Sequence, residues 1–391
     1  MNYRDNIWKL YAIRFFHNLI PAYVIERLFW EQRGMTIQMV VYTEIIYAVT
    51  VVLLEIPTGI IADKWGRKRL IIVDAFLGCC ELLILIYATG FRHFAAAIFL
   101  AGIGRAAGSG SENALLYDSL LSNGEEQSFE KCLGRLNALD FIAAIVAALS
   151  GSLMAGWRGF ELNYWISCVS MLISLCISFT LVEPEVRSRT DVPVPIKEYV
   201  VASVSFFRSN HGVCLILLSA MIAGSAMNFI DEFWQLYASR LGIPVIYFGI
   251  LSSVLSILRL PGNVLAYRIK EKVSYRKLIS GIILVFAAGF LYMCLNRGIT
   301  SIVMIFLICI VSGIIEPAAA GYLHHRIDSS MRATIDSFQS LGLRAAIIIT
   351  GLGFGYFSSE FNIYGGYGYI SAVCLLFLVY FMVSSKNAIE E

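Results

Sequence analysis

The feature that most constrains this chain is a series of apolar runs, each long enough to cross a lipid bilayer. Hydrophobic residues make up 58% of the 391 residues and charged residues 15%, and the mean hydropathy is +0.72. A soluble domain carries about 25% charged residues, and soluble packing cannot bury this much apolar surface. Because a spanning helix needs roughly 20 apolar residues, a chain of this length accommodates twelve helices joined by short loops.

The hydropathy pattern therefore predicts an all-α membrane protein with twelve transmembrane helices. The expected spans are residues 7–30, 37–62, 70–90, 94–121, 130–156, 161–182, 211–238, 244–269, 275–296, 299–325, 331–357 and 363–384. A polar stretch with three prolines, residues 183–210, follows the sixth span. It is expected to be a cytoplasmic linker between an N-terminal six-helix bundle, residues 1–182, and a C-terminal six-helix bundle, residues 211–391.

Lys and Arg are distributed unevenly over the predicted loops and termini. One side carries 20 of the 30 basic residues and the opposite side carries 5. Since basic loops stay in the cytoplasm, both termini are expected there, in a multi-pass protein of the cell membrane. No nucleic-acid partner is expected, and the chain is expected to be a monomer. The nine cysteines lie mostly within apolar runs and show no C-x-x-C spacing, so they are interpreted as small core residues, and no metal site is expected.

A tight basic loop separates the second and third predicted spans. It reads GIIADKWGRKR at residues 59–69. The loop resembles the signature of the major facilitator superfamily, G-x-x-x-D-[RK]-x-G-[RK]-[RK], and Gly59, Asp63, Gly66, Arg67 and Lys68 stand at fixed positions of that pattern. The resemblance implies a secondary transporter of two six-helix bundles that works by alternating access.

The same resemblance implies a latch on the cytoplasmic side. Asp118, at the cytoplasmic end of the fourth predicted helix, is the expected partner of Arg67. Asp63 is expected to approach the start of helix 11, near Arg332 and Asp336. The residues alone say only that an acid at the membrane surface beside a basic loop will find a cation.

An internal repeat supports the division into two halves. An offset of 204 places Pro57 on Pro261, and intramembrane charges then coincide: Arg27 with Asp231, Glu112 with Glu316 and Asp140 with Arg344. Charges inside a membrane are rare, so this agreement indicates duplicated six-helix halves. Such halves, related by an axis along the membrane normal, are the architecture of the superfamily.

Ionisable residues inside the predicted spans are costly and are functional candidates by default. They are Arg14, Glu26, Arg27, Glu44, Glu55, Glu81, Arg105, Glu112, Asp140, Asp231, Glu232, Arg259, Glu316 and Arg344. In the fold that the chain resembles, helix 2 faces helix 11 and helix 5 faces helix 8. This implies two cross-half pairs, Glu55 with Arg344 and Asp140 with Arg259, as a cytoplasmic gate; the alternative is that each charge pairs within its own half.

Two further groups of charges have expected roles, one as an external gate and the other in coupling to protons. Arg27 and Asp231, near the external ends of helices 1 and 7, are expected to form an external gate, or else to face external water. The stretch from Arg105 to Glu112 resembles the superfamily's helix 4 pattern R-x-x-x-G-x-G, although its glycines fall one residue early. In relatives that arginine is associated with proton coupling. Glu112, Glu316, Asp140 and Glu81 are the candidate proton carriers; the alternative for Arg105 and Glu112 is a structural pair.

The predicted function is proton-coupled export of a small amphiphilic or antibiotic-like compound. The alternative is a proton-coupled importer of a nutrient, peptide or metal–ligand complex, because the exporter pattern G-P-x-x-G-G is missing from residues 148–156. A third class, a receptor or lipid-handling protein without transport, predicts static charge pairs. No P-loop, G-x-S-x-G or metal-ligand spacing is present. The protein is therefore not expected to be an enzyme, and it needs no cofactor beyond the proton as coupling ion.

Overall fold

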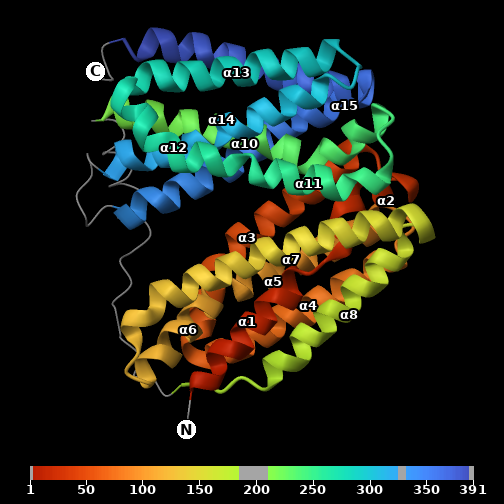
Figure 1. The fold of residues 1–391 in the computed structure, drawn as a ribbon, viewed down its shortest axis with the longest axis vertical. Helices are drawn as coiled ribbons and strands as arrows, with labels where there is room; N and C mark the ends of the chain where they lie inside the picture. Colours follow the sequence, from red (N-terminus) through yellow and green to blue (C-terminus); the bar gives the residue numbers. More distant parts are fainter. Residues whose placement is uncertain (1–2, 185–209, 325–331, 387–391) are drawn as a thin grey trace. The chain divides into compact units, whose positions relative to one another are not determined.

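The computed structural model describes residues 3–184, 210–324 and 332–386, and Figure 1 shows their helices. The side chains of residues 56, 63, 324 and 332–337 lie outside this description. Every regular element within the described ranges is helical, as the hydropathy predicts. The chain divides into two units: residues 1–190 with 243–253 form unit 1, and residues 191–242 with 254–391 form unit 2. The predicted linker, residues 183–210, falls almost wholly outside the described residues.

Unit 1 contains the elements coloured red to yellow in Figure 1. These are α1 (Arg4–Asn18), η1 (Pro21–Ile25), α2 (Glu26–Gln32), α3 (Ile37–Trp65), α4 (Arg67–Ile86), α5 (Phe91–Gly108), α6 (Ser111–Ser122), η2 (Glu126–Ser128), α7 (Phe129–Arg158) and α8 (Glu161–Phe179). A short 3-10 turn, η3 (Val245–Tyr247), and the start of α11 (Phe248–Ile257) pack with them. Gly249 lies directly against the backbone of Ala148 in α7, at a place where a side chain would overlap it.

Unit 2 contains the elements coloured green to blue in Figure 1. These are α10 (His211–Arg240), the end of α11, α12 (Arg259–Lys272), α13 (Tyr275–Leu295), α14 (Ser301–His324) and α15 (Arg332–Ser384). The long α15 has non-helical backbone at Phe361 and Asn362, which separates the last two predicted spans. Helices α12 and α14 approach closely because Gly313 meets the carbonyl of Arg259, where a side chain would not fit.

Apart from residues 325 and 331, which lie outside the described residues, the twelve predicted ranges coincide with helical segments, but three of the ranges are interrupted. The first is broken between α1 and α2, the fourth between α5 and α6, and the eighth between α11 and α12. The prediction of one continuous helix over each of these ranges is therefore wrong. By length and composition, eight segments of the described residues qualify as membrane spans.

The first interruption is stabilised by α8. The side-chain amide of Asn163 donates to the carbonyl oxygens of Pro21 at 3.3 Å and Gly151 at 2.9 Å. The hydroxyl of Ser167 accepts from the backbone N–H of Ala22 at 3.0 Å. A broken helix is tolerated in a membrane only where neighbouring groups satisfy its freed backbone. These two polar side chains, which the hydropathy reading treats as ordinary members of an apolar span, have this role.

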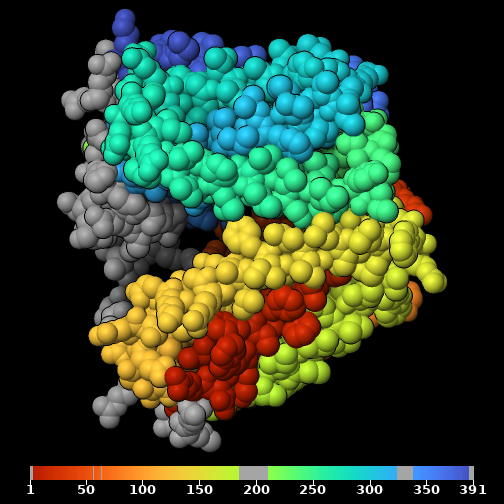
Figure 2. Space-filling model, in the orientation of Figure 1, coloured from red at the N-terminus to blue at the C-terminus, as the bar shows by residue number. Residues whose placement is uncertain are grey.

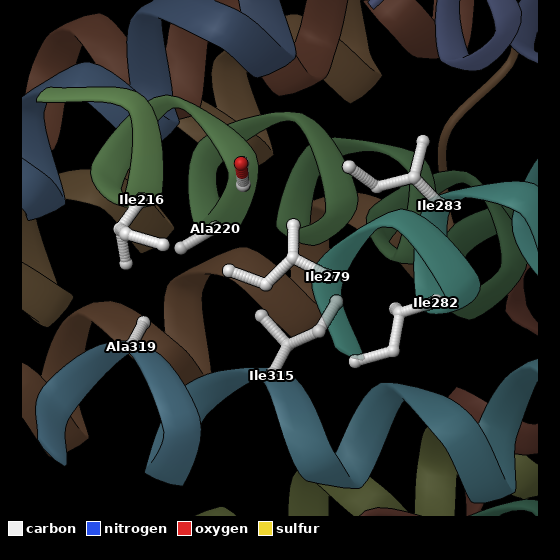
Figure 3. A pocket seen from close by; sticks show the side chains of 8 residues that line it. Ile216, Ala220, Ile279, Ile282, Ile283, Ile315 and Ala319 are labelled. Carbon is white, nitrogen blue, oxygen red and sulfur yellow. The ribbon is translucent and has the colours of Figure 1, made fainter. Parts of the chain in front are cut away.

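The core of unit 2 is aromatic and tightly packed. The rings of Phe229 and Phe354 stack at 4.7 Å between centroids, and those of Phe290 and Tyr367 at 5.7 Å. A cavity of about 10 Å³ remains between α10, α13 and α14 (Figure 3). Its lining is apolar except for Ser219, whose hydroxyl donates to Leu215 O at 2.7 Å. A space of this size holds at most one water molecule and is too small for a substrate.

Candidate functional site

A three-residue ion cluster lies inside unit 1, and it joins α1, α6 and α7. Arg14 Nη1 is 2.5 Å from Glu112 Oε2, and Arg14 Nε donates to Asp140 Oδ1 at 2.9 Å and Oδ2 at 3.1 Å. One turn later on α1, Asn18 Nδ2 donates to Asp140 Oδ1 at 2.9 Å. Arg14 and Asn18 share a helix face because they are four residues apart. One cation therefore serves two carboxylates from two different helices.

The cluster lies close to the middle of the membrane-crossing part of unit 1. Arg14 and Asp140 stand 10 and 11 residues after the starts of α1 and α7, and Glu112 stands 10 residues before the end of α6. At 1.5 Å per residue these are distances of about 15 Å, half of an apolar layer roughly 30 Å thick. The start of α1 and the end of α6 lie together, since Asn6 Nδ2 donates to Ser119 Oγ at 3.0 Å. Figure 2 shows α1 and α7 side by side.

The break between α5 and α6 positions Glu112. Gly110 has φ of +80°, which favours glycine, and it turns the chain so that Glu112 begins α6 in its first turn. Arg105 and Glu112 therefore lie on two different helices, α5 and α6, and not on the single helix that was predicted over 94–121. Arg105 is exposed on α5, whereas Glu112 is buried and bound to Arg14.

Asp74 of α4 belongs to the same region, and the sequence analysis missed it. Its Oδ1 lies 2.9 Å from the position that a side-chain carbon would take at Gly104 of α5, and its carboxylate also abuts Gly108. It is within electrostatic range of His17, Arg105 and Glu112. The signal was available, because Asp74 is an acid inside the predicted span 70–90. Two glycines of α5 make room for this carboxylate.

A second group of charges in unit 1 surrounds Arg27 of α2. Arg27, only 4% exposed, has Nη2 at 2.7 Å from Glu44 Oε1 and Nη1 at 3.7 Å from Glu26 Oε2, and its guanidinium lies 4.5 Å from the Trp30 ring centroid. Glu81 of α4 is within electrostatic range of Glu26. Arg27, predicted for the external gate, thus has partners within its own unit.

In unit 2, Arg259 of α12 forms a two-pronged ion pair with Asp231 of α10. Its Nη1 is 3.2 Å from Asp231 Oδ2, and its Nη2 contacts Oδ1. The expected cross-half partners were Asp140 for Arg259 and Arg27 for Asp231. Within the described residues, all four charges have partners in their own unit. For Asp140 and Arg259 this is the alternative weighed from the sequence, whereas for Arg27 and Asp231 the alternative was contact with external water.

The remaining residues predicted for the gate or as proton carriers, Glu55, Glu316 and Arg344, lie on three different helices. Glu55 is exposed on α3, Glu316 is exposed on α14, and Arg344 is half-buried on α15. The pairing of Glu55 with Arg344, and both gates, stay predictions.

The basic signature loop is a sharp turn between α3 and α4. Gly66 has φ of +95°, and a side chain there would meet the Glu183 carboxyl group at 3.0 Å. The Glu183 carboxylate accepts from the backbone N–H groups of Arg67 at 2.8 Å and Lys68 at 2.7 Å, so it caps the start of α4. A carboxylate in this position satisfies two N–H groups that a helix start leaves without partners.

The side chain of Arg67 points back to α6. It forms an ion pair with Asp118, the partner expected from the sequence, and donates to Ala114 O at 2.9 Å. Gly59 faces open space. The side chains of Asp63, Arg332 and Asp336 lie outside the described part of the chain, so the latch across the halves stays a prediction.

A family profile described as Major Facilitator Superfamily matches residues 11–334. The chain belongs to the major facilitator superfamily. Over 137 residues it is 32% identical to an uncharacterized transporter of Buchnera aphidicola subsp. Schizaphis graminum (strain Sg), a match that covers 35% of this chain and 34% of that protein. The chain spans about a third of the length of the curated relatives it matches.

Solved structures of the superfamily share the fold at low sequence identity. The nucleoside transporter NupG has a TM-score of 0.81 at 14% identity, over 99% of this chain and 100% of that one. A bacterial homolog of the human lysosomal transporter Spinster, inward-facing and occupied, has a TM-score of 0.73 at 13% identity, over 99% and 98% of the two chains. These likenesses show the fold of a superfamily transporter, and they leave the substrate and the direction of transport to other observations.

The net charge of the Arg14 cluster changes when one of its carboxylates gains or loses a proton. With both carboxylates ionised the three side chains carry a net charge of −1, and with one protonated they carry none. The structure offers no rival metal centre: among the described residues, no group of three or more His, Cys, Asp or Glu side chains is placed to hold an ion.

Proposed function

We propose that this member of the major facilitator superfamily couples proton movement to the export of a small amphiphilic compound. The observation that supports this most directly is the sharing of Arg14 between Glu112 and Asp140. In a low-dielectric region, two carboxylates that share one arginine carry one negative charge in excess, and uptake of one proton by either carboxylate removes that excess. Secondary transport needs such a group, because energy enters only through the ion that moves.

The two carboxylates differ in how firmly they are held, which suits a mechanism in which one of them gains and loses a proton. Asp140 lies on the continuous helix α7 and is held by both Arg14 and Asn18. Glu112 lies just after the glycine break between α5 and α6, and it forms an ion pair with Arg14. Protonation of Glu112 would release Arg14 to Asp140 alone and would free the start of α6 from α1. We infer that Glu112 is the switching acid and that Asp140 holds the arginine in place.

The opposite direction is the second candidate. Residues 148–156 of α7 lack the proline and paired glycines of the exporter pattern, and the fold is shared with NupG, a nucleoside transporter. The missing exporter pattern favours a proton-coupled importer of a nutrient, and the shared fold adds nucleosides to the compounds to be tested. The Arg14 cluster serves either direction, since antiport and symport differ in the order of binding rather than in the proton carrier. Under either candidate we expect a monomer in the cell membrane with both termini in the cytoplasm.

The test is proton flux in proteoliposomes that contain the full-length protein and a trapped pH dye. A panel of antibiotics, dyes, nucleosides and peptides is added under an imposed pH gradient. Proton movement opposite to a compound supports export, and movement in the same direction supports import. Glu112→Gln should abolish coupled flux, whereas Glu161→Gln, which removes an exposed carboxylate bound to Arg33 at 2.6 Å, should leave it unchanged. Compound transport that continues without any proton movement would contradict the proposal.

The cytoplasmic gate is tested separately by exchange of charge. Glu55→Arg and Arg344→Glu are each expected to reduce transport, and the two together are expected to restore it. A double variant no better than either single variant would contradict this pairing, and it would leave the role of the Arg14 cluster untouched.

A further inference from the structure

A groove on unit 1 is unrelated to the Arg14 cluster. It has a volume of about 530 Å³ and lies where α3 and α8 end and α4 begins. Its lining consists of Trp65, Lys68, Arg69, Ile72, Phe179, Leu181, Val182 and Glu183. The volume is within the range of small-molecule sites, and the lining combines cations with large apolar side chains.

The charges of the groove favour an anion. Two cations, Lys68 and Arg69, line it. The one acid of the lining, Glu183, is already engaged, because both of its oxygens accept backbone N–H groups of Arg67 and Lys68. These N–H groups belong to the start of α4, which is itself the positive end of a helix dipole. With Lys68, Arg69 and Glu183 all ionised the lining carries a net charge of +1, and the groove presents two side-chain cations to an incoming ligand.

The apolar part of the groove favours an acyl chain. Trp65 is 60% exposed and Phe179 is 59% exposed, and both are the last residues of their helices. Tryptophan at a helix end is typical of the boundary between headgroups and hydrocarbon. A soluble anion such as inorganic phosphate would satisfy the cations and leave both of these aromatic rings uncovered. A lipid covers them together with Ile72, one turn into the membrane from Lys68.

We propose that this groove binds a phospholipid with an anionic headgroup, with the phosphate at Lys68 and Arg69 and an acyl chain along Phe179 and Ile72. The basic loop lies on the side that the distribution of Lys and Arg assigns to the cytoplasm, and anionic lipid is concentrated in that leaflet. This binding site is independent of the transported compound and of the proton carrier.

The test measures quenching of Trp65 by brominated lipids. The full-length protein is reconstituted into phosphatidylcholine vesicles with increasing fractions of dibromo-phosphatidylglycerol. Trp65 is one of six tryptophans, so its signal is taken as the difference between the wild-type protein and Trp65→Phe. The Arg69→Gln variant should need about five times more phosphatidylglycerol for half-maximal quenching, since one cation near an anionic surface contributes about that factor.

The matched control is Lys64→Gln, which removes the same charge from the same loop but does not line the groove. Its quenching curve should match that of the wild type. Equal loss in Lys64→Gln and Arg69→Gln would show only diffuse attraction and would overturn the proposal. Equal quenching by dibromo-phosphatidylcholine would overturn the headgroup assignment, and relief of quenching by inorganic phosphate would show a free-anion site instead. Helical circular dichroism of each variant confirms that it has folded.

Discussion

Replacement of Arg14 by glutamine is expected to destabilise unit 1 and abolish coupled flux, because it leaves two carboxylates facing each other without their cation. Arg14 makes hydrogen bonds to Glu112 at 2.5 Å and to Asp140 at 2.9 and 3.1 Å. Its side chain is 27% exposed, as is that of Asp140, and that of Glu112 is 10% exposed. The loss of one partner from a buried ion pair costs about 3–5 kcal/mol. Because the cluster is partly exposed, we expect the loss of Arg14 to cost about 3 kcal/mol, the lower end of this range.

That free energy is large enough to measure by thermal unfolding in detergent. For a unit of this size, 1 kcal/mol changes the melting temperature by about 2–4 °C, so Arg14→Gln should melt on the order of 10 °C lower. Lys9→Gln is the matched control: it removes a cation from the same helix, where Lys9 Nζ donates to Thr180 O at 2.7 Å in an exposed position. Surface changes of this kind stay within about 0.5 kcal/mol.

A second variant distinguishes loss of charge balance from loss of packing. Asp140→Asn in the Arg14→Gln background removes one of the two unpaired carboxylates, and it should recover about half of the lost stability. If Arg14→Gln melts at the same temperature as Lys9→Gln, or if Asp140→Asn brings no recovery, the electrostatic account of the cluster is wrong. In that case Glu112 could not be the switching acid either.

Three smaller changes test the backbone features that build the site. Gly104→Ala places a methyl group 2.9 Å from Asp74 Oδ1 and should cost about 1 kcal/mol or more, whereas Gly134→Ala, in open space on α7, should stabilise slightly. Gly66→Ala forces φ of +95° on a side chain and should cost about 1–3 kcal/mol. Asn163→Ala removes the side-chain amide that donates to Pro21 O in the broken first helix and to Gly151 O in α7, and it should also cost about 1–3 kcal/mol. Each is read from the melting temperature, and an unchanged value for Gly104→Ala, Gly66→Ala or Asn163→Ala would refute that assignment.

Part of the site was predictable because it depends on short-range sequence. The pattern around Gly66 and Arg67 identified the turn between α3 and α4, and the resemblance to the superfamily implied Asp118 as the partner of Arg67. The residues alone indicated only that an acid beside a basic loop finds a cation. The positions of ionisable residues inside apolar spans selected Arg14, Glu112 and Asp140 as candidates. Asp74 could have been selected by the same criterion. In each case the signal is local, and hydropathy or a turn makes it visible.

The partners of those charges could not be predicted in the same way. Spacing along a chain places residues on a common helix face only while the helix is continuous. The break at Gly110 places Arg105 and Glu112 on two different helices. The choice of Arg14 as the cation for both Glu112 and Asp140 depends on which helices pack beside α1. The capping of α4 by Glu183, more than a hundred residues away in sequence, has the same origin.

The sequence by itself determined the solvent, the helical class and the family of this protein, since the length and hydropathy of each segment decide whether it can cross a bilayer. Only the tertiary structure decided where the helices break and which charges meet. The physical reason is that an isolated charge or a broken helix is unstable in an apolar medium wherever it occurs. Its stability comes from partners such as Asn163 at the first break and Arg14 at the two carboxylates, and packing alone brings those partners into place.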